Sequence, residues 1–359
     1  MTAKTARSDG RAFAIGGRMV GPGHPAYIVA ELSANHAGDL DRALEIVRLA
    51  AETGVDAIKL QTYTADTLTI DCDGPHFRIE GGLWHGRTLY DLYQEAHTPW
   101  EWHEALFDEA RRCGLRCFST PFDASAVRFL EQFDPPVYKL ASFEILDLEL
   151  ITAIAETGRP VIMSTGMSNL SEIAEAIHTF RAHGTRDLAV LRCVSSYPAD
   201  PADFDLATIP NIAETFDVVS GLSDHSMGHT VALTAVALGA HVIEKHFIAR
   251  RADGGPDSAF SMEPAEMKAL VEAVRQAEAA IGRVRYGAGL AESGNVVFRR
   301  SIFAVADIAA GEPFTRENTR VIRPGHGLPP RDLPQVLGRR AARDIARGTP
   351  LRWPLVGGP

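Results

Sequence analysis

Two lysines and a set of hydroxyl side chains follow or interrupt short apolar runs in this sequence. Lys59 and Lys139 lie inside such runs, where a lysine is seldom buried without a partner. The hydroxyl residues at comparable positions are Thr120, Ser142, Ser164, Ser195 and Ser223. Amines and hydroxyls that converge on one cavity suit a phosphate or carboxylate ligand. We therefore expect an anion site, although any single Ser or Thr could instead cap a helix.

Two histidines, His225 and His246, end successive apolar runs. Imidazoles on neighbouring strand ends can share one divalent metal, with water and substrate oxygens completing its shell. Two nitrogens without a thiolate do not match structural zinc, so an octahedral ion such as Mn²⁺ or Mg²⁺ fits better. The alternative is a pair of hydrogen-bonded histidines without a metal.

Glu31 ends the first apolar run and is the carboxylate expected nearest the centre of the pocket. It is a candidate general base, or a residue that positions a reacting group. The alternative is a buried carboxylate that only pairs with a lysine.

Eight apolar runs of strand length alternate with segments of helical periodicity. The runs are 27–31, 56–61, 115–119, 137–141, 160–164, 188–193, 218–223 and 241–246. The helical segments are 40–51 behind a cap at Asp39, 100–113, 123–133, 147–157, 168–183, 227–239 and 263–281, with 203–216 the least clear. Eight such units over about 250 residues predict a (β/α)8 (TIM) barrel, in which the C-terminal ends of the strands bring the polar residues together. A doubly wound sheet is the alternative, but no GxGxxG turn follows the first run.

Four further segments complete the predicted organisation. A β-hairpin at 12–20, with a two-residue turn at Gly16-Gly17, could close the bottom of the barrel. The barrel domain is expected over 1–282, with an insertion at 62–97 on the face where active sites lie. A Gly-rich linker at 283–295 then leads to a small β-rich domain at 296–359.

Aromatic residues gather in and just after the insertion. They are Phe77, Trp84, Tyr90, Tyr93, Trp100 and Trp102. We expect most of them to pack the insertion onto the barrel, and a minority could line a pocket for a substrate with apolar parts.

The composition is that of an ordinary globular protein, with 45% hydrophobic and 23% charged residues and a net charge of −10. It excludes disordered, collagen-like and coiled-coil classes, and the negative charge argues against a nucleic-acid partner. We expect neither a membrane span nor a secretory signal, and four cysteines without a disulfide framework fit the cytoplasm.

The charge is not spread evenly along the chain. From Asn295 onward, eleven arginines oppose five acids, a charge of 11 − 5 = +6. This segment could dock over an acidic body or an anionic ligand.

Seven short motifs occur in a fixed order along the barrel segment. They are Ala30-Glu31 through Asn35-His36, Ile58 through Thr62, Ser119 through Phe122, Tyr138 through Ser142, Ser164 through Met167, Ser223 through Ser226, and Glu244 through Phe247. These motifs resemble those of the sialic acid synthases, and Arg323-Pro324-Gly325 resembles the motif of their small antifreeze-like (SAF) domain. The segment 81–103 is most similar to the pseudaminic acid synthase branch, whereas Ser195 stands where neuraminate synthases tend to carry Asn.

The resemblance implies a condensation of phosphoenolpyruvate (PEP) with an amino sugar, 2,4-diacetamido-2,4,6-trideoxy-altrose in the pseudaminic branch. It implies a metal at His225 and His246, with Mn²⁺ first and Mg²⁺ or Co²⁺ as alternatives. It also implies PEP binding by Lys59, Thr120, Lys139, Ser142, Ser164, Ser195 and Ser223, pocket carboxylates at Glu31 and Glu144, and sugar contacts from Tyr197, Asp257 and Arg323. Arg323 would come from the partner in a domain-swapped homodimer. An N-acetylneuraminate or legionaminate synthase, a Schiff-base aldolase using Lys139 or Lys245, and a non-catalytic sugar-binding barrel are the alternatives.

Overall fold

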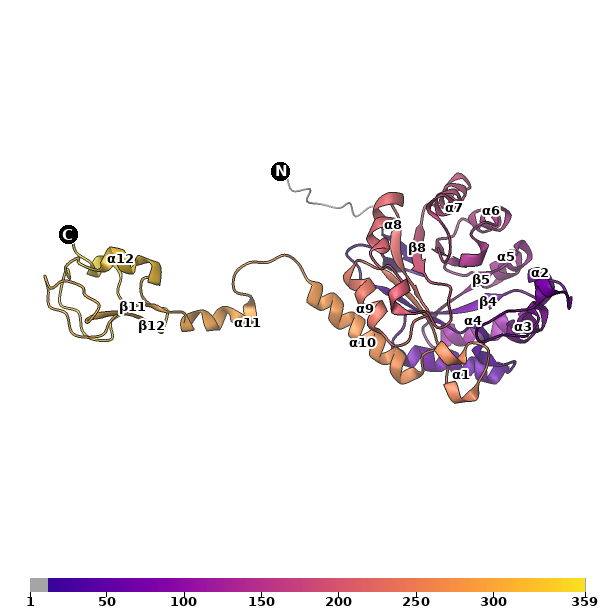
Figure 1. Ribbon diagram of the computed structural model, residues 1–359, viewed down its shortest axis with the longest axis horizontal. Coiled ribbons are helices and arrows are strands. Elements are labelled where there is room, and N and C mark those ends of the chain that lie inside the picture. The colour runs from indigo at the N-terminus through magenta and orange to yellow at the C-terminus, as the bar shows by residue number, and fades with distance from the viewer. Residues whose placement is uncertain (1–11, 359) are drawn as a thin grey trace. The chain divides into compact units, whose positions relative to one another are not determined.

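The computed structural model describes residues 12–358, and this part of the chain divides between Gly282 and Arg283 into two compact units (Figure 1). The expected outer bounds at residues 1 and 359 lie outside the described part. Within residues 12–358, no helix combines the length and apolar character that crossing a membrane would require.

The first unit is built on an eight-stranded parallel sheet. Its strands are β3 (Tyr27–Glu31), β4 (Ala57–Thr62), β5 (Arg116–Pro121), β6 (Tyr138–Leu140), β7 (Val161–Ser164), β8 (Leu188–Cys193), β9 (Val219–Asp224) and β10 (Val242–His246). The hydrogen-bonded order is β5-β4-β3-β10-β9-β8-β7-β6. β3 and β10, the first and last of these strands in the sequence, are paired, so the sheet curls into a barrel. β5 and β6 also lie side by side, without a ladder between them in the described chain. The predicted TIM barrel is confirmed, and each observed strand overlaps its predicted run.

Helices alternate with these strands and cover the barrel from outside (Figure 1). They are α1 (Leu40–Thr53), α4 (His103–Arg112), α5 (Ala124–Leu130), α6 (Leu148–Ala155), α7 (Leu170–Ala182), α8 (Thr208–Phe216), α9 (Thr230–Ala237) and α10 (Pro264–Ile281). The Asp39 side chain caps α1 by accepting from the backbone N–H groups of Asp41 and Arg42, as its position predicts. The least clear helix forms as α8, which begins at Thr208 and is therefore shorter than the expected 203–216, and a separate 3₁₀ turn precedes it at Pro201–Asp203.

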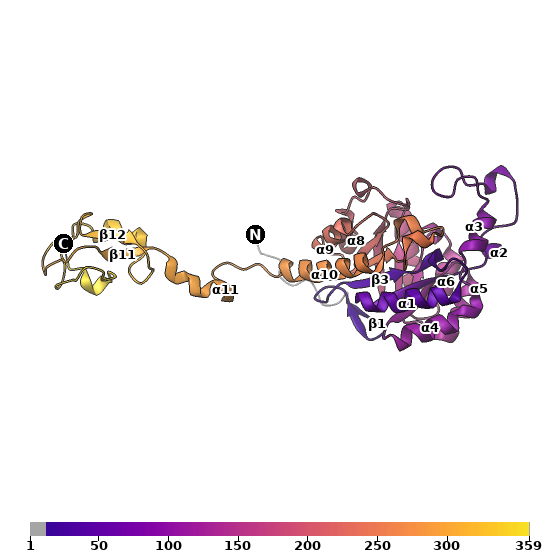
Figure 2. The same ribbon diagram turned by 90° about the horizontal axis from the view of Figure 1, so that it is seen from below.

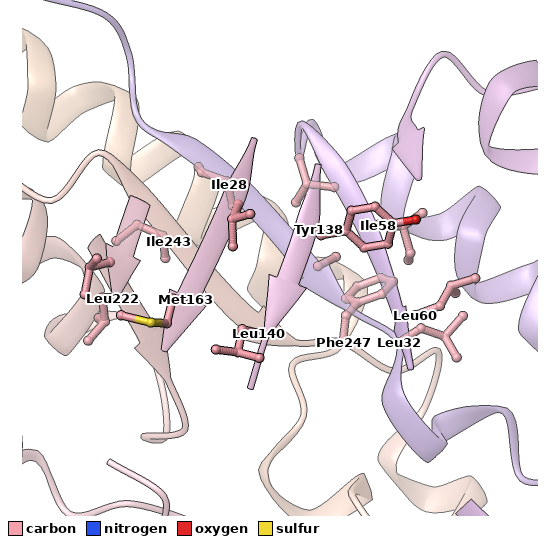
Figure 3. Close-up of a cluster of buried hydrophobic side chains, with 14 of the residues drawn as sticks. Ile28, Leu32, Ile58, Leu60, Tyr138, Leu140, Met163, Leu222, Ile243 and Phe247 are labelled. Carbon is pink, nitrogen blue, oxygen red and sulfur yellow. The ribbon is translucent and has the colours of Figure 1, made fainter. Parts of the chain in front are cut away.

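Successive residues of each strand point to opposite faces, and this alternation separates two cores. One set of strand residues, including Ile28, Ile58, Tyr138 and Ile243, packs against the helices (Figure 3). The other set fills the barrel interior, and its members are Tyr27, Val29, Ala57, Phe118, Val137, Ile162, Ala189, Leu191, Val219 and Val242. The inward positions nearest the C-terminal strand ends are therefore the ones that face a pocket.

The predicted hairpin forms as β1 (Phe13–Ile15) and β2 (Arg18–Val20), which pair in antiparallel fashion. Gly16 and Gly17 occupy the turn with φ of +56° and +86°, a backbone region that glycine adopts readily. Phe13, Ile15 and Val20 are buried in the interior core together with the inward strand residues. The hairpin thus closes the bottom of the barrel and leaves chemistry to the opposite end.

The segment after β4 carries α2 (Ala65–Leu68) and α3 (Leu89–Ala96), and between them it extends as a loop (Figure 2). Three aromatic contacts attach its flanks to neighbouring elements. Tyr63 meets Tyr93, Trp100 stacks on Phe129 at 4.4 Å between ring centroids, and Trp102 meets His36 at 5.4 Å. Tyr93, Trp100 and Trp102, three of the six aromatic residues in and just after the insertion, therefore have the expected packing role.

The first helix of the second unit is the short α11 (Leu290–Ser293), which lies within the segment expected to be a linker. Its sheet consists of β11 (Ser301–Ala304) and β12 (Thr319–Ile322), followed by the short helix α12 (Leu333–Val336). Isolated bridges add to it, and its core holds Ile302, Ala304, Ile308, Phe314, Val336, Ala341, Ile345, Leu351, Leu355 and Val356.

Candidate active site

Between the apolar interior core and the C-terminal ends of the strands, several inward-facing residues are charged. Glu31 on β3 and Lys59 on β4 are register partners, and the carboxylate Oε2 lies 2.6 Å from the ammonium Nζ. Glu244 on β10 lies on the other side of Lys59, with 3.4 Å between its Oε1 and Nζ. All three residues are buried, so the barrel holds a desolvated cluster of two carboxylates and one ammonium group.

Burial and neighbouring charges shift the pKa values of this cluster in opposite directions. Burial raises the pKa of Glu31, and Lys59 only partly offsets this effect. For Lys59, burial acts downward, but Glu244 and Glu31 outweigh it and raise the pKa of the ammonium group. For Glu244, burial acts upward, but Lys59 and Lys139 outweigh it and lower the pKa of the carboxyl. The cluster therefore keeps Lys59 charged and makes Glu31 the carboxyl that takes up a proton more easily.

Lys139 supplies a second buried amine in the same pocket. Its Nζ donates to the carbonyl of Leu140 at 2.8 Å, and no carboxylate forms an ion pair with it among the described residues. Burial lowers its pKa, and the positive charge of Lys59 adds to that effect. A lysine held in this way gains strongly from an incoming anion.

Glu144 follows β6 and is half-buried at the rim of the pocket. Burial raises the pKa of its carboxyl to about 7, with Lys139 acting in the opposite direction. The side chain can therefore exchange a proton near neutral pH.

Three of the predicted hydroxyl ligands line this pocket on separate strands. Thr120 accepts from the Nζ of Lys59 at 3.0 Å, and Ser223 donates to Glu244 at 3.4 Å. The Ser164 hydroxyl is buried and has no hydrogen-bond partner. A buried hydroxyl without a partner is costly, so Ser164 is a place where a bound oxyanion would be stabilised.

Ser142 and Ser195 meet around Gly166, just beyond β7. A Cβ atom on Gly166 would lie 2.6 Å from Ser195 Oγ and 2.7 Å from Ser142 Oγ. Only a residue without a side chain fits there, at a φ of +29°. Two hydroxyls thus flank the backbone of the buried Gly166, an arrangement that suits phosphate oxygens.

His225 and His246 lie next to each other at the ends of β9 and β10, with ring centroids 5.3 Å apart. Nδ1 of His225 is 2.8 Å from the carbonyl of Val194, which leaves Nε2 available. Nδ1 of His246 is buried without a hydrogen bond, and burial together with His225 lowers the pKa of this ring well below its usual value. For His225, burial acts downward, but Cys193 and the Val194 carbonyl outweigh it and raise the pKa of the ring, so a metal would have to displace a proton there. The available nitrogens of the two rings fit a metal ion, although no group of three or more metal-ligating residues occurs in the described chain.

Tyr197 and Asp257 border the histidine pair. The Tyr197 ring lies 4.4 Å from His225 and 6.3 Å from His246 between centroids. Asp257 Oδ2 lies 3.8 Å from His246 Nδ1, and burial raises the pKa of this carboxyl. Both predicted sugar-contacting residues of the barrel unit therefore lie beside the predicted metal ligands.

Ser33 and Gln61 belong to the same polar network, although neither was among the predicted ligands. The Ser33 hydroxyl donates to Asp257, and Gln61 Nε2 donates to Ser33 Oγ at 3.1 Å. Gln61 could have been identified by period two, since it follows Lys59 on the inward face. Ser33 lies in a 3₁₀ turn with φ of +48°, and no periodicity identifies it.

Lys245 does not face this pocket, although it lies on β10 between Glu244 and His246, which do. Its Nζ lies 2.8 Å from Asp224 Oδ2 and donates to the carbonyl of Ser226. Since Glu244 and His246 face inward, the residue between them faces the helical layer. The idea that all polar strand ends converge on one cavity is wrong for Lys245 and Asp224.

Arg323 belongs to the second unit and follows β12. It is exposed and forms no hydrogen bond or ion pair within the described chain. The loop after it is held by buried Ser301, which donates to the carbonyl of Pro324 at 2.7 Å and accepts from the N–H of Gly327 at 2.9 Å. The arginine thus projects from a well-supported loop.

This chain is similar to known proteins over most of its length. Residues 46–286 match the NeuB family and residues 299–356 match the SAF domain. The chain is 45% identical to the pseudaminic acid synthase of Campylobacter jejuni, over 91% of this chain and 95% of that protein. It is 42% identical to the pseudaminic acid synthase of Helicobacter pylori, over 91% and 96%.

A solved structure shares the fold. The crystal structure of N-acetylneuraminic acid synthetase from Leptospira borgpetersenii, in complex with citrate, superposes with a TM-score of 0.72 at 29% identity, over 80% of this chain and 95% of that one. The inward layer of charged strand ends, the family match over most of the barrel and the SAF match after it lead to one conclusion: this chain belongs to the NeuB family of condensing synthases and carries a SAF domain.

Proposed function

We propose that this protein joins phosphoenolpyruvate to 2,4-diacetamido-2,4,6-trideoxy-altrose, with pseudaminic acid and phosphate as products. The observation that carries the proposal is the buried inward layer of Lys59, Lys139 and hydroxyls at the C-terminal end of the barrel. The identity to pseudaminic acid synthases, 45% and 42%, against 29% for the neuraminic acid synthetase, favours the pseudaminic product.

In this proposal PEP occupies the pocket of the two lysines. Lys59 and Lys139 supply positive charge to an anion, and the partnerless Ser164 hydroxyl gains a hydrogen bond. The cradle around Gly166 holds phosphate oxygens between Ser142 and Ser195. Thr120 and Ser223 complete the hydroxyl set, bonded to Lys59 and Glu244.

His225 and His246 hold a divalent metal in this proposal, and Mn²⁺ is the expected ion, with Mg²⁺ or Co²⁺ as alternatives. Such an ion supplies Lewis-acid polarisation of the sugar aldehyde. The available nitrogens of the two rings support the assignment. Tyr197 and Asp257, which border the rings, orient the sugar.

The condensation forms one carbon–carbon bond and releases phosphate. Carbon three of PEP attacks the aldehyde carbon, water adds at carbon two, and the carbon two–oxygen bond to the phosphoryl group then breaks. Glu31, with its raised pKa, orients that water or accepts its proton. Glu144 is a second group able to hold a proton near neutral pH.

We further propose a homodimer in which the SAF domain of one copy completes the site of the other, with Arg323 over the sugar. Support comes from the net charge of +6 after Asn295 and from the exposed Arg323 on its supported loop. Apolar side chains around the barrel mouth and in the first residues of the second unit are also exposed, namely Phe143, Leu146, Met167, Leu170, Tyr286, Leu290 and Phe298. A second copy would cover such surfaces. The four free cysteines fit a cytoplasmic location.

Turnover with PEP against a panel of sugars tests the function. We expect 2,4-diacetamido-2,4,6-trideoxy-altrose to give a kcat/KM above those of N-acetylmannosamine and of the other diacetamido hexoses in the panel. A reversed order would move the assignment to a neuraminate or legionaminate synthase. Borohydride trapping with substrate separates the Schiff-base alternative, because a covalent adduct on Lys139 would contradict the proposal, and phosphate release rejects a binding-only barrel.

A further inference from the structure

The insertion between α2 and α3 contains an ordered hairpin over residues 78–88. Arg78 and Thr88 form an antiparallel bridge, and the Ile79 N–H donates to the Arg87 carbonyl at 2.9 Å. The Gly86 N–H donates back to the Ile79 carbonyl at 2.9 Å. Thr88 is buried and caps α3 by accepting from the backbone N–H of Asp91. The tip of this hairpin is therefore held in place from α3.

Trp84 is the residue at this tip that turns inward. Residues 80–83, 85 and 86 are exposed, and Leu83 is 50% exposed, whereas Trp84 is half-buried. Its indole N–H donates to the carbonyl of Pro256 at 3.0 Å. Its ring lies 5.7 Å from the Tyr197 ring between centroids, at an interplanar angle of 51°. The tip thus contacts two loops that bear the predicted sugar-binding residues.

These contacts extend an aromatic wall outward from the histidine pair. Tyr197 packs on His225 at 4.4 Å and on Phe260 at 5.2 Å, and Phe260 packs on His246 at 4.9 Å. Trp84 adds the next ring beyond Tyr197, further from the histidines. Pro256 directly precedes Asp257, so the indole hydrogen bond also ties the hairpin to the loop that carries this carboxylate.

We propose that Trp84 is a specificity-determining residue that packs against the 6-methyl group of the sugar, and this rests on the proposed function. The aldehyde end of the sugar lies at the histidine pair in that function, so the opposite end of the chain of carbons extends along Tyr197 toward Trp84. An indole face gains from contact with a methyl group, whereas a hydroxyl placed there loses hydrogen bonds to water without replacement. The tip therefore selects a 6-deoxy sugar over its 6-hydroxy counterpart.

The test compares two sugars that differ by one oxygen atom. They are 2,4-diacetamido-2,4,6-trideoxy-altrose and its 6-hydroxy analogue, 2,4-diacetamido-2,4-dideoxy-altrose. The ratio of their kcat/KM values is measured for the wild type, Trp84→Ala, Trp84→Phe and the neighbouring Leu83→Ala as the matched control. An apolar pocket disfavours an analogue that only adds a hydroxyl by about 100-fold, and we expect a preference of this order for the wild type.

The Ala variant should lose at least about tenfold of this preference, because only the 6-deoxy sugar loses its methyl contact. The Phe variant should keep most of the preference, since it retains an aromatic face while lacking the indole N–H. Leu83→Ala and the KM for PEP should remain at wild-type values. An equal loss for both sugars in the Ala and Phe variants would overturn the inference, because it would mean that Trp84 only supports the hairpin.

Calorimetric binding of the same two sugars separates this inference from the proposed function. If the wild type turned over neither sugar but bound the 6-deoxy sugar more tightly in a Trp84-dependent way, the function would be wrong and the inference would stand. If the wild type bound both sugars equally, or neither, the inference would be overturned. A wild type that turned over the altrose with no preference at carbon six would overturn the inference alone.

Discussion

Glu31 and Lys59 are paired twice, once by strand register and once by charge. They are opposite each other on β3 and β4, and their carboxylate and ammonium groups lie 2.6 Å apart in the buried interior. Breaking a buried pair costs about 3–5 kcal/mol, because the remaining partner is left charged in a desolvated place. This cost concerns the free energy of unfolding, whereas the proposed function assigns Lys59 to the anion, so the two roles can be separated.

Lys59→Met should lower the free energy of unfolding by about 3–5 kcal/mol and abolish measurable PEP binding. Adding Glu31→Gln to this variant should restore part of the stability, because it removes an unpaired carboxylate, but it should not restore PEP binding. Urea unfolding and PEP titration measure the two effects. Arg111→Met, which removes an exposed ion pair with Asp108, is the control and should cost at most about 1 kcal/mol. Recovery of PEP binding in the double variant would contradict the assignment of Lys59.

Removal of the metal should abolish turnover. Exhaustive treatment with EDTA should eliminate phosphate release from PEP, and Mn²⁺ should restore it. His246→Ala should lower metal affinity by about 10–100-fold or more and leave the unfolding transition nearly unchanged, because the change lies at a site and not in a core. His183→Ala, an exposed histidine, is the matched control. Full turnover by the chelated enzyme would contradict a metal at His225 and His246.

Because of Glu144, the free energy of unfolding should decrease as the pH rises toward neutrality. Burial raises the pKa of the Glu144 carboxyl in the folded state from the usual 4.5 to about 7, so the folded protein binds more protons than the unfolded chain between these values. The free energy of unfolding therefore decreases from about pH 4.5 to about pH 7 through this group. Glu144→Gln should flatten that part of the profile, as measured by urea unfolding at several pH values. Glu149→Gln, an exposed neighbour, removes the same charge and should leave the slope in place.

Arg323→Ala should lower kcat/KM by at least about tenfold, equivalent to about 1.4 kcal/mol, if the arginine contacts the sugar. Arg323→Lys should recover only part of the activity, because lysine lacks the planar fork of donors. Arg331→Ala, another exposed arginine of the SAF domain, is the control. Steady-state kinetics at saturating PEP checks the three variants, and unchanged kcat/KM in Arg323→Ala would exclude this arginine from the site.

Mixing two inactive variants tests whether the arginine acts on the partner. Arg323→Ala combined with Lys139→Ala, under conditions that exchange subunits, should regenerate activity, because one site of the mixed dimer would have an intact barrel and an intact arginine. Subunit exchange can be followed with a size-tagged copy. Exchange without recovered activity would mean that each SAF domain serves its own barrel.

The amino-acid sequence alone determined the architecture and most of the strand-end residues. Short apolar runs alternating with helical periodicity specify a (β/α)8 barrel because strands and helices bury their faces with different periods. Lys59, Lys139, His225 and His246 could be identified because amines and imidazoles are unusual at the ends of apolar runs. Gly16-Gly17 predicted a hairpin because the turn requires positive φ at both residues.

Only the tertiary structure decided which polar residues share the pocket. Lys245 and Glu244 are adjacent in sequence, yet one pairs with Asp224 outside the barrel and the other with Lys59 inside, because successive strand residues point to opposite faces. Ser33 reaches Asp257, 224 positions away, through a turn at positive φ that no pattern announces. Trp84 likewise looks like any exposed loop residue until the hairpin folds back and sets its indole against Pro256 and Tyr197. Such contacts depend on loop conformations, which backbone hydrogen bonds and long-range packing select and which local residue preferences do not specify.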